Sequence, residues 1–191
     1  MNTLETLIIE AKHCQECSKH LPNEPRPIFQ IGKNAKILII GQAPGRKVQD
    51  SGIPFQDASG DRLRDWMGIS SEQFYDPDFL AIMPMGFCYP GKGSSGDLPP
   101  RSECAPLWHA AFLSKLPNIQ LTLLIGQYAQ AYYLKESLKE SLTKTVEAWE
   151  TYLPEYLPLP HPSPRNNIWL KKNPWFERDV VTELQRRIRA I

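Results

Sequence analysis

Two short apolar runs that each end in glycine constrain the fold of this chain more than any other feature. KILIIG occupies residues 36–41 and LTLLIG occupies residues 121–126. A continuous apolar run of this length is typical of a strand that is buried on both faces, as in a parallel sheet. Two further strands are predicted by FLAIMPMGF, which begins at Phe79 and is interrupted by Pro84, and by EYLPLP at residues 155–160.

Helical patterns fill the gaps between these strands. The predicted helices cover residues 59–68, 102–116, 127–138 and 174–191, with Ser59 and Ser102 as N-caps. Alternation of strand and helix predicts a three-layer α/β/α sandwich around a central four-stranded, mostly parallel sheet. A chain of 191 residues that is 41% hydrophobic is suited to one core, so we expect a single domain over residues 1–191.

Loops rich in glycine, proline and polar residues follow the predicted strands. In a parallel α/β sheet, ligands bind beyond the carboxyl ends of the strands, so these loops are expected to converge on one rim. The first loop begins with Gly41, Gln42, Ala43, Pro44 and Gly45. It contains neither GxxxxGK nor GxGxxG, which argues against a nucleoside triphosphate or dinucleotide site. Its backbone amides are suited to holding an anion or a water molecule.

An aromatic residue and two acids lie further along this loop. Phe55 is able to stack on a planar ligand, or to pack in the core. Asp57 lies between the aromatic residue and the start of a predicted helix, which makes it the better candidate for a base or a charge stabiliser. Asp61 is interpreted as a helix-capping or dipole-pairing residue.

The segment HPSPRN at residues 161–166 holds a histidine and a serine between prolines. Proline fixes its own φ and biases the residue before it toward an extended conformation, so His161 and Ser163 are presented on a nearly pre-formed loop. The pattern fits a polar turn, and it also fits a loop that orders its side chains for binding.

Four cysteines fall into two pairs, Cys14 with Cys17 and Cys88 with Cys104. The first residues carry two glutamates, whereas a signal peptide begins with basic residues and continues with apolar ones, so a secretory signal is not expected. Disulfide frameworks are typical of secreted proteins, so none is expected here. Four thiolates are suited to zinc or to an iron-sulfur cluster, and spacing alone does not separate the two. A thioredoxin-like redox pair and unconnected cysteines are the alternatives.

The length and charge of the chain narrow its expected location and partners. No apolar run approaches the roughly 20 residues of a membrane helix, so we expect a cytoplasmic protein without a membrane partner. The net charge of +1 does not mark a strongly basic nucleic-acid binder. Local basic residues such as Arg165, Lys171 and Lys172 are nevertheless candidates for a basic face.

The order of these segments resembles the uracil-DNA glycosylase superfamily. GQAPG after a buried strand, then GIPF, then HPSPRN near the end match along nearly the whole chain. The cysteines resemble those of its iron-sulfur families, known as family four and family five. That resemblance implies a 4Fe-4S cluster held by Cys14, Cys17, Cys88 and Cys104, ahead of zinc.

The resemblance implies an enzyme that flips a damaged base out of DNA and hydrolyses its N-glycosidic bond, with uracil as the default substrate. Residues 41–45, including Gln42, are then the water-activating loop, and Phe55 is the stacking platform. His161 is the donor to the base carbonyl, as in the single-strand-selective branch that HPSPRN resembles most. Ser163 is expected to contact a phosphate, and Pro164, Arg165 and Asn166 to begin the loop that wedges into the duplex.

Departures from the family patterns leave alternatives open. Ala43 stands where the best-known branch has its catalytic aspartate, and Gln42 replaces a glutamate. Asp57 resembles, by its distance before SGD, the aspartate that family five has after its own PF segment, and this resemblance implies that Asp57 is the partner of the water. Pro84 lies near the position at which family four has the asparagine that recognises uracil. Backbone groups of residues 85–87 are the alternative groups for recognising a base edge. The damaged base is therefore either uracil or another lesion, such as hypoxanthine, xanthine or an oxidised pyrimidine. The other functions considered are an inactive DNA- or nucleotide-binding relative and a thiol redox protein. A monomer is expected.

Overall fold

The computed structural model describes residues 3–191. Four strands form one sheet in the order β2-β1-β3-β4, and every neighbouring pair is parallel. The strands are β1 (Ile37–Ile40), β2 (Leu80–Ile82), β3 (Leu121–Ile125) and β4 (Tyr156–Leu159). The prediction of a four-stranded α/β sheet is confirmed, with the sheet parallel throughout.

Alternate residues of the strands feed two separate hydrophobic cores. In β1, Leu38 and Ile40 belong to one core, while Ile37 and Ile39 belong to the other. All four side chains are fully buried because each face of the sheet carries its own layer of helices. The continuous apolar runs of the sequence therefore report a sheet that is covered on both sides.

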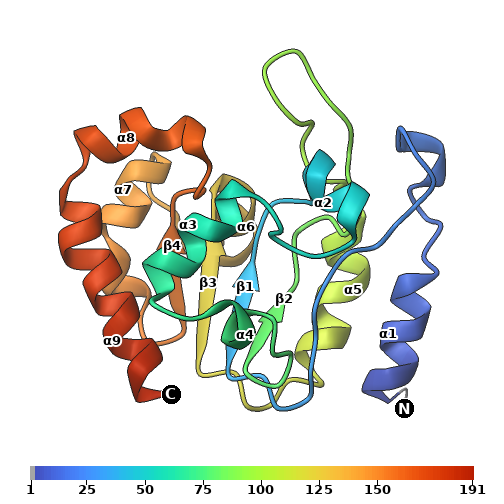
Figure 1. The fold of residues 1–191 in the computed structure, drawn as a ribbon, viewed down its shortest axis with the longest axis horizontal. Coiled ribbons are helices and arrows are strands. Elements are labelled where there is room, and N and C mark those ends of the chain that lie inside the picture. Colours follow the sequence, from blue (N-terminus) through green and yellow to red (C-terminus); the bar gives the residue numbers. More distant parts are fainter. Residues whose placement is uncertain (1–2) are drawn as a thin grey trace.

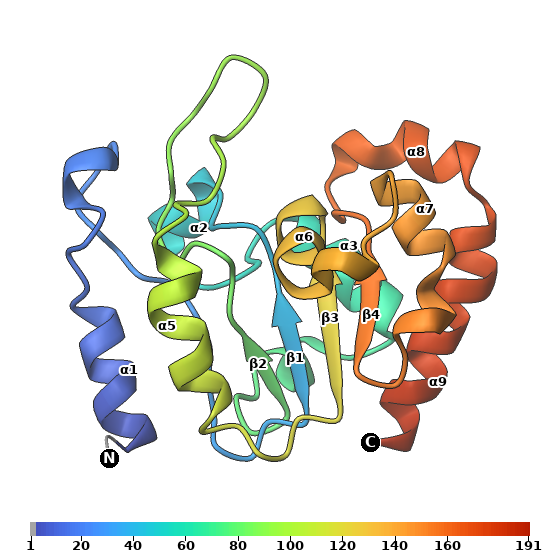
Figure 2. The ribbon, with the colours of Figure 1, turned by 180° about the vertical axis from the view of Figure 1, so that it is seen from behind.

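Three helices cover the first face. They are α1 (Leu4–Lys12), α5 (Cys104–Leu113) and α6 (Gln127–Leu134). Phe112 and Ala129 bring α5 and α6 into the first core, and Leu7 brings α1 against it. Figure 2 shows α5 and α6 in front of the sheet and α1 beside α5 at the edge of the molecule.

The second face is covered mainly by α3 (Ala58–Met67), α4 (Ser71–Phe74) and the C-terminal helical segment. That segment consists of a π-helical turn, η5 (Phe176–Val181), followed by α9 (Thr182–Ala190). Trp66 packs edge-on against Phe176 with ring centroids 4.8 Å apart, which joins α3 to η5. The remaining elements are η1 (Ser18–His20), α2 (Arg46–Ser51), η2 (Lys135–Ser137), α7 (Leu142–Glu147), η3 (Trp149–Tyr152), η4 (Pro164–Asn166) and α8 (Asn167–Lys172).

Both helix caps predicted from the sequence are wrong. Asp57, not Ser59, is the N-cap of α3, because its carboxylate reaches two free backbone amides of the first turn. Glu103, not Ser102, precedes α5, and its side chain makes no cap hydrogen bond. The predicted helix at residues 127–138 ends as an α-helix at Leu134 and continues as η2, and the strand predicted from Phe79 is cut to three residues.

The loops after the four strands lie at one end of the sheet and both termini lie at the other (Figure 1). A long loop between β2 and α5 stands out from this end, above α2. Within residues 3–191, no helix has the length and apolar character needed to cross a bilayer.

Candidate active site

The loops at the carboxyl ends of the strands enclose a cleft of about 500 Å³. It is lined by all the catalytic and DNA-binding candidates from the sequence except Pro164 and the alternative base readers at residues 85–87. These lining residues are Gly41, Gln42, Ala43, Pro44, Gly45, Phe55, Asp57, His161, Ser163, Arg165 and Asn166. The parallel sheet brings the first loop and the HPSPRN segment together although 115 residues of sequence or more separate them.

The first loop is held by the backbone of the loop after β2. The Met85 amide donates to the Gly41 carbonyl at 2.9 Å, and the Gly86 amide donates to the Gln42 carbonyl at 3.0 Å. The Phe87 amide donates to the Cys104 sulfur at 3.3 Å. All three amides therefore have a partner within the protein, and base reading by backbone groups of residues 85–87 stays a prediction.

Phe55 adopts a backbone conformation that is unusual for a residue with a side chain. Its φ is +54°, a left-handed value that costs free energy and is often found at functional sites. Its ring lies 3.3 Å from the position that a Cβ on Gly41 would occupy, and it packs edge-on against Phe74 at 6.1 Å. The ring thus forms one wall of the cleft, against the start of the first loop.

Asp57 both caps α3 and lines the cleft. Its Oδ1 accepts hydrogen bonds from the amides of Ser59 at 2.9 Å and Gly60 at 3.0 Å. Among residues 3–191, no protein donor bonds to Oδ2. The cap therefore fixes the carboxylate in one orientation and leaves one oxygen for a ligand or a water molecule.

His161 has a defined tautomer in this arrangement. The Ser163 amide donates to its Nδ1 at 3.2 Å, so a neutral ring carries its proton on Nε2. Burial lowers the pKa of His161 below its ordinary value, against the opposing effect of Asp57 and Asp97. A neutral ring with an Nε2–H group is suited to donating a hydrogen bond to a ligand in the cleft.

The rest of HPSPRN is braced from inside. The Asn166 side-chain amide donates to the His161 carbonyl at 2.7 Å, and Arg62 of α3 donates to the Ser163 carbonyl at 3.1 Å. The Ser163 hydroxyl accepts from the Arg165 amide at 3.2 Å and caps η4. Pro164 and Arg165 are exposed. The segment is therefore an ordered loop whose tip faces solvent.

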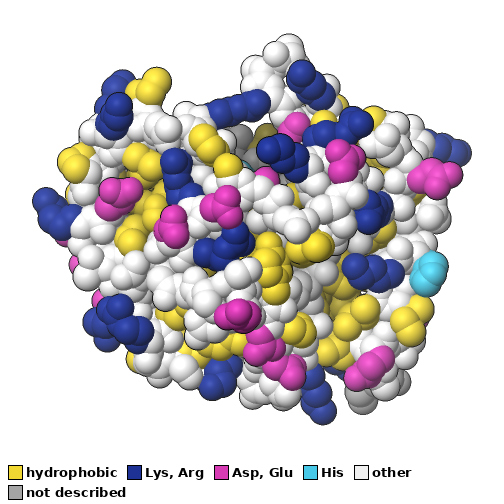
Figure 3. All heavy atoms as spheres, viewed as in Figure 1, with side chains coloured by type: hydrophobic (Ala, Val, Ile, Leu, Met, Phe, Trp, Pro, Cys, Tyr) yellow, Lys and Arg dark blue, Asp and Glu magenta, His cyan; other side chains and the backbone are white. Residues whose placement is uncertain are grey.

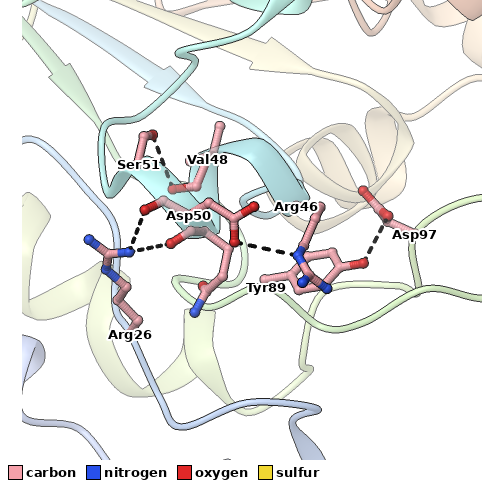
Figure 4. A network of polar contacts seen from close by, with 8 residues as sticks. Arg26, Arg46, Val48, Asp50, Ser51, Tyr89 and Asp97 are labelled. Atoms are coloured by element: carbon pink, nitrogen blue, oxygen red, sulfur yellow. Dashed lines mark hydrogen bonds and ion pairs between the residues drawn. The ribbon is translucent and has the colours of Figure 1, made fainter.

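Sequence reasoning missed a second carboxylate in the cleft, Asp97, and two cations directly after residues 41–45, Arg46 and Lys47. Asp97 accepts a hydrogen bond of 3.4 Å from the hydroxyl of the buried Tyr89 (Figure 4). Arg46 lies in the same region and pairs with Asp50 at 3.4 Å. The position of Arg46 and Lys47 directly after GQAPG was the available signal for the cations, whereas nothing in PGKGSSGD marks Asp97.

Positive side chains lie around the cleft. Arg46, Lys47 and Arg165 line it, and Lys92 lies on the loop that stands above it. Lys and Arg side chains gather along the upper edge of the face in Figure 3, over the loops at the strand ends. The near-neutral net charge thus conceals a local basic rim.

A buried histidine supports the loop after β2. His109 of α5 is 1% exposed; its Nε2 lies 3.0 Å from the Pro84 carbonyl and its Nδ1 lies 2.7 Å from the Tyr133 hydroxyl. A carbonyl only accepts, so Nε2 is the donor and the hydroxyl donates to Nδ1. Burial lowers the pKa of His109 to about 4.

The four cysteines line one small cavity beside the cleft, formed by the N-terminal segment, the loop after β2 and the start of α5. All four are free thiols. Burial raises the pKa of the Cys88 thiol to about 11 and that of Cys104 to about 12. These thiols are therefore neutral unless a cation displaces their protons.

Two buried donors in the wall of this cavity lack a protein partner. They are Nε of Arg101 and Nε1 of Trp108. Unpaired buried donors are rare and call for an acceptor, and the sulfurs of an iron-sulfur cluster are acceptors. Within residues 3–191, no three His, Cys, Asp or Glu side chains are arranged to hold one metal ion. The cavity thus brings together four thiols and two unpaired hydrogen-bond donors.

Comparison with known proteins agrees with this geometry. Residues 29–185 match the model of the uracil DNA glycosylase superfamily. The chain is also similar to the type-4 uracil-DNA glycosylase of Saccharolobus solfataricus, with 24% identity over 140 residues. The similar region covers 71% of this chain and 61% of the length of that relative.

Proposed function

Because this chain belongs to the uracil-DNA glycosylase superfamily, we propose that it binds a damaged base flipped out of DNA and hydrolyses the N-glycosidic bond. Uracil is the default substrate. The observation that carries this proposal is the tautomer of His161, whose Nε2–H is available in the cleft that Asp57 and Phe55 also line. The protein is proposed to act on DNA in the cytoplasm, as a single-domain monomer.

The cleft offers a separate group for each part of the reaction. Phe55 provides a flat apolar wall on which a base can stack. As the bond between C1′ and the base nitrogen breaks, its electron pair leaves with the base. His161 Nε2–H stabilises the negative charge that develops on the base carbonyl. A water molecule supplies the hydroxyl group that ends on C1′.

Asp57 is the proposed partner of that water. Residues 41–45 carry no carboxylate, because Gln42 and Ala43 occupy the positions next to Gly41. Oδ1 of Asp57 is held by the start of α3, and Oδ2 has no protein donor within residues 3–191. Oδ2 is therefore suited to orienting the water and accepting its proton, while the Gln42 side chain is a second polar group in the same cleft.

DNA contacts are assigned to the rim of the cleft. Arg46, Lys47 and Arg165 are suited to phosphates, whose neutralisation dominates protein–DNA affinity. Pro164 and Arg165 form the exposed tip of a loop that is braced by Arg62, which fits a wedge that supports a distorted duplex. The Ser163 hydroxyl already caps η4, so a phosphate contact from Ser163 must share this group.

The cysteine cavity is proposed to hold a 4Fe-4S cluster through Cys14, Cys17, Cys88 and Cys104. When bound, the cluster supplies a structural cross-link. Cys88 and Cys104 flank the loop that stands above the cleft, and Cys14 and Cys17 follow α1. Arg101 and Trp108 are the proposed hydrogen-bond donors to the cluster. A single zinc ion is the weaker candidate, because it brings no sulfide acceptors of its own for these two donors.

The test is a base-release assay on single- and double-stranded oligonucleotides that carry uracil, hypoxanthine or xanthine, followed by alkaline cleavage of abasic sites. Wild-type protein is expected to cut at least one of these lesions, and the Asp57→Asn and His161→Ala variants to lose base release while they keep DNA binding. A folded, metal-loaded protein that cuts none of them would contradict the proposal.

A second candidate function is lesion binding without cleavage. It is favoured by one observation, the absence of a carboxylate from residues 41–45 of the first loop. An inactive relative is expected to bind lesion DNA tightly and to leave it intact in the same assay.

A further inference from the structure

A hairpin between β2 and α5 extends over the mouth of the cleft. The Leu98 amide donates to the Gly91 carbonyl at 2.8 Å, and the Gly93 amide donates to the Gly96 carbonyl at 2.6 Å. Lys92 and Asp97 form an antiparallel bridge between its two sides. This is the loop that stands out above α2 in Figures 1 and 2.

The hairpin contacts both motifs that define the cleft. Oδ2 of Asp97 lies 3.5 Å from the position that a Cβ on Gly45 would occupy, at the end of the first loop. On the other side, a guanidinium nitrogen of Arg165 lies 2.8 Å from the equivalent position on Gly96. The hairpin therefore spans from GQAPG to HPSPRN, and Asp97 is its acidic residue at the cleft.

The carboxylate of Asp97 is held by a buried side chain. Tyr89 is 5% exposed, and its hydroxyl donates to Oδ1 of Asp97 at 3.4 Å. Cations line the same cleft, yet within residues 3–191 Asp97 forms no ion pair. Figure 4 shows the Tyr89–Asp97 contact close to Arg46. Its negative charge also reaches His161, since Asp57 and Asp97 both oppose the lowering of the histidine pKa by burial.

An exposed negative charge inside a basic rim works against DNA binding, because it repels the phosphates that the rim attracts. The presence of an acidic residue at this position is explained if its carboxylate accelerates the breaking of the glycosidic bond. Breaking the glycosidic bond leaves positive charge on the deoxyribose ring, and an oriented carboxylate beside that ring stabilises the charge. Residues 41–45 lack such a group, and Asp97 lies beside Gly45.

We propose that Asp97 is a catalytic carboxylate, which the hairpin carries to the first loop and which stabilises the positive charge on the sugar as the base departs. This role rests on the proposed glycosylase function. Asp57 orients the water, and Asp97 contacts the sugar. Tyr89 is a positioning residue, because its hydroxyl holds the Asp97 carboxylate and Tyr89 itself does not line the cleft.

The first test compares wild type and Asp97→Asn on the lesion that wild type cuts. The single-turnover rate of base release is expected to fall by about a hundredfold, within the range for loss of one preorganised charge-stabilising group. The dissociation constant for the same DNA is expected to stay equal or to decrease, because one repelling charge is gone. An unchanged rate would overturn the proposal.

Asp50→Asn is the matched control. Asp50 is also exposed and lies near Arg46, but it does not line the cleft. Its loss removes the same charge and is expected to leave the rate of base release unchanged. If Asp50→Asn slows base release as much as Asp97→Asn does, the effect belongs to general electrostatics and the proposal is wrong.

A double-mutant cycle with Tyr89→Phe tests the positioning role. Tyr89→Phe alone is expected to slow base release by about tenfold, and to have no further effect in the Asp97→Asn background. Equal effects in both backgrounds would remove Tyr89 from the proposal. Failure of the glycosylase function itself is a separate result, since wild-type protein then releases no base at all.

Discussion

At the scale of single residues, the site depends on conformations that are unfavourable elsewhere. Phe55 holds a left-handed backbone while its ring lies against Gly41 and Phe74. Burial lowers the pKa of His161, and the Ser163 amide selects the tautomer of its neutral ring. Each of these features costs free energy, which the packing of the surrounding residues offsets. Such features are typical of residues that contact a ligand.

Replacing Phe55 tests the stacking wall. Phe55→Ala is expected to weaken binding of lesion-containing single strands by about ten- to a hundredfold, because base–aromatic stacking contributes roughly 1–3 kcal/mol per base. Phe55→Tyr keeps the ring and is expected to bind nearly as well as wild type. Fluorescence anisotropy measures both, and equal affinity of Phe55→Ala and wild type would refute the stacking role.

At the scale of elements, the start of α3 and the packing of α5 against the loop after β2 position the site. Asp57 directly precedes α3, so one carboxylate serves as helix cap and as cleft wall. His109 of α5 donates to the Pro84 carbonyl and accepts from Tyr133 of α6. These contacts fix two of the loops that line the cleft.

Gly60 allows α3 to approach Phe55. A Cβ on Gly60 would lie only 1.8 Å from the Phe55 carbonyl oxygen. Glycine to alanine inside a helix normally stabilises by about 1 kcal/mol, but here we expect Gly60→Ala to destabilise by about 1–3 kcal/mol and to reduce base release. Thermal unfolding of wild type and Gly60→Ala shows whether the substitution lowers or raises the stability. Asp65→Ala, at an exposed position of the same helix, is expected to be near neutral.

His109 makes stability depend on pH. Its pKa is about 4 in the folded protein and near 6.5 when unfolded, so the unfolded chain binds the proton more readily between these values. The contribution of neutral His109 to the free energy of unfolding is complete above pH 6.5. As the pH falls toward 4, about 3 kcal/mol of this contribution is lost. Urea unfolding of wild type and His109→Gln at pH 7 and pH 4.5 should show a smaller loss in the variant, and equal losses would contradict this prediction.

At the scale of the whole molecule, the cysteine cavity and the cleft share one segment of chain. Cys88 and Cys104 flank the hairpin, whose residues Pro90, Gly96 and Asp97 line the cleft. Cys14 and Cys17 add the N-terminal segment to the same cavity. A group bound by all four thiolates would therefore anchor the base of the active-site hairpin.

Removal of that group is expected to loosen the hairpin. Protein purified without oxygen should be brown and contain iron and sulfide, whereas Cys88→Ser should lose the colour. Hydrogen exchange of residues 89–103 should rise in this variant, while that of α9 stays as in wild type. A colourless wild-type protein without iron, or an unchanged hairpin after loss of the iron, would contradict the anchoring role.

The sequence by itself determined the layers of this protein and the chemistry of its loops. Continuous apolar runs such as residues 36–41 form only where both faces of a sheet are covered, and the glycine, proline and histidine patterns of GQAPG and HPSPRN follow these runs. The roles of these residues in base release stay predictions until the assays are done.

Only the tertiary structure decided which side chains meet. The cap of α3 depends on which oxygen reaches its free amides, and the contact of Asp97 with Gly45 depends on how a hairpin folds back over a loop about 50 residues earlier in the chain. In the sequence, nothing distinguishes His109 from other helix residues, and its hydrogen bond to the Pro84 carbonyl is seen only in the folded chain. Local patterns reflect burial and backbone preference, whereas these contacts form between segments that only the folded chain brings together.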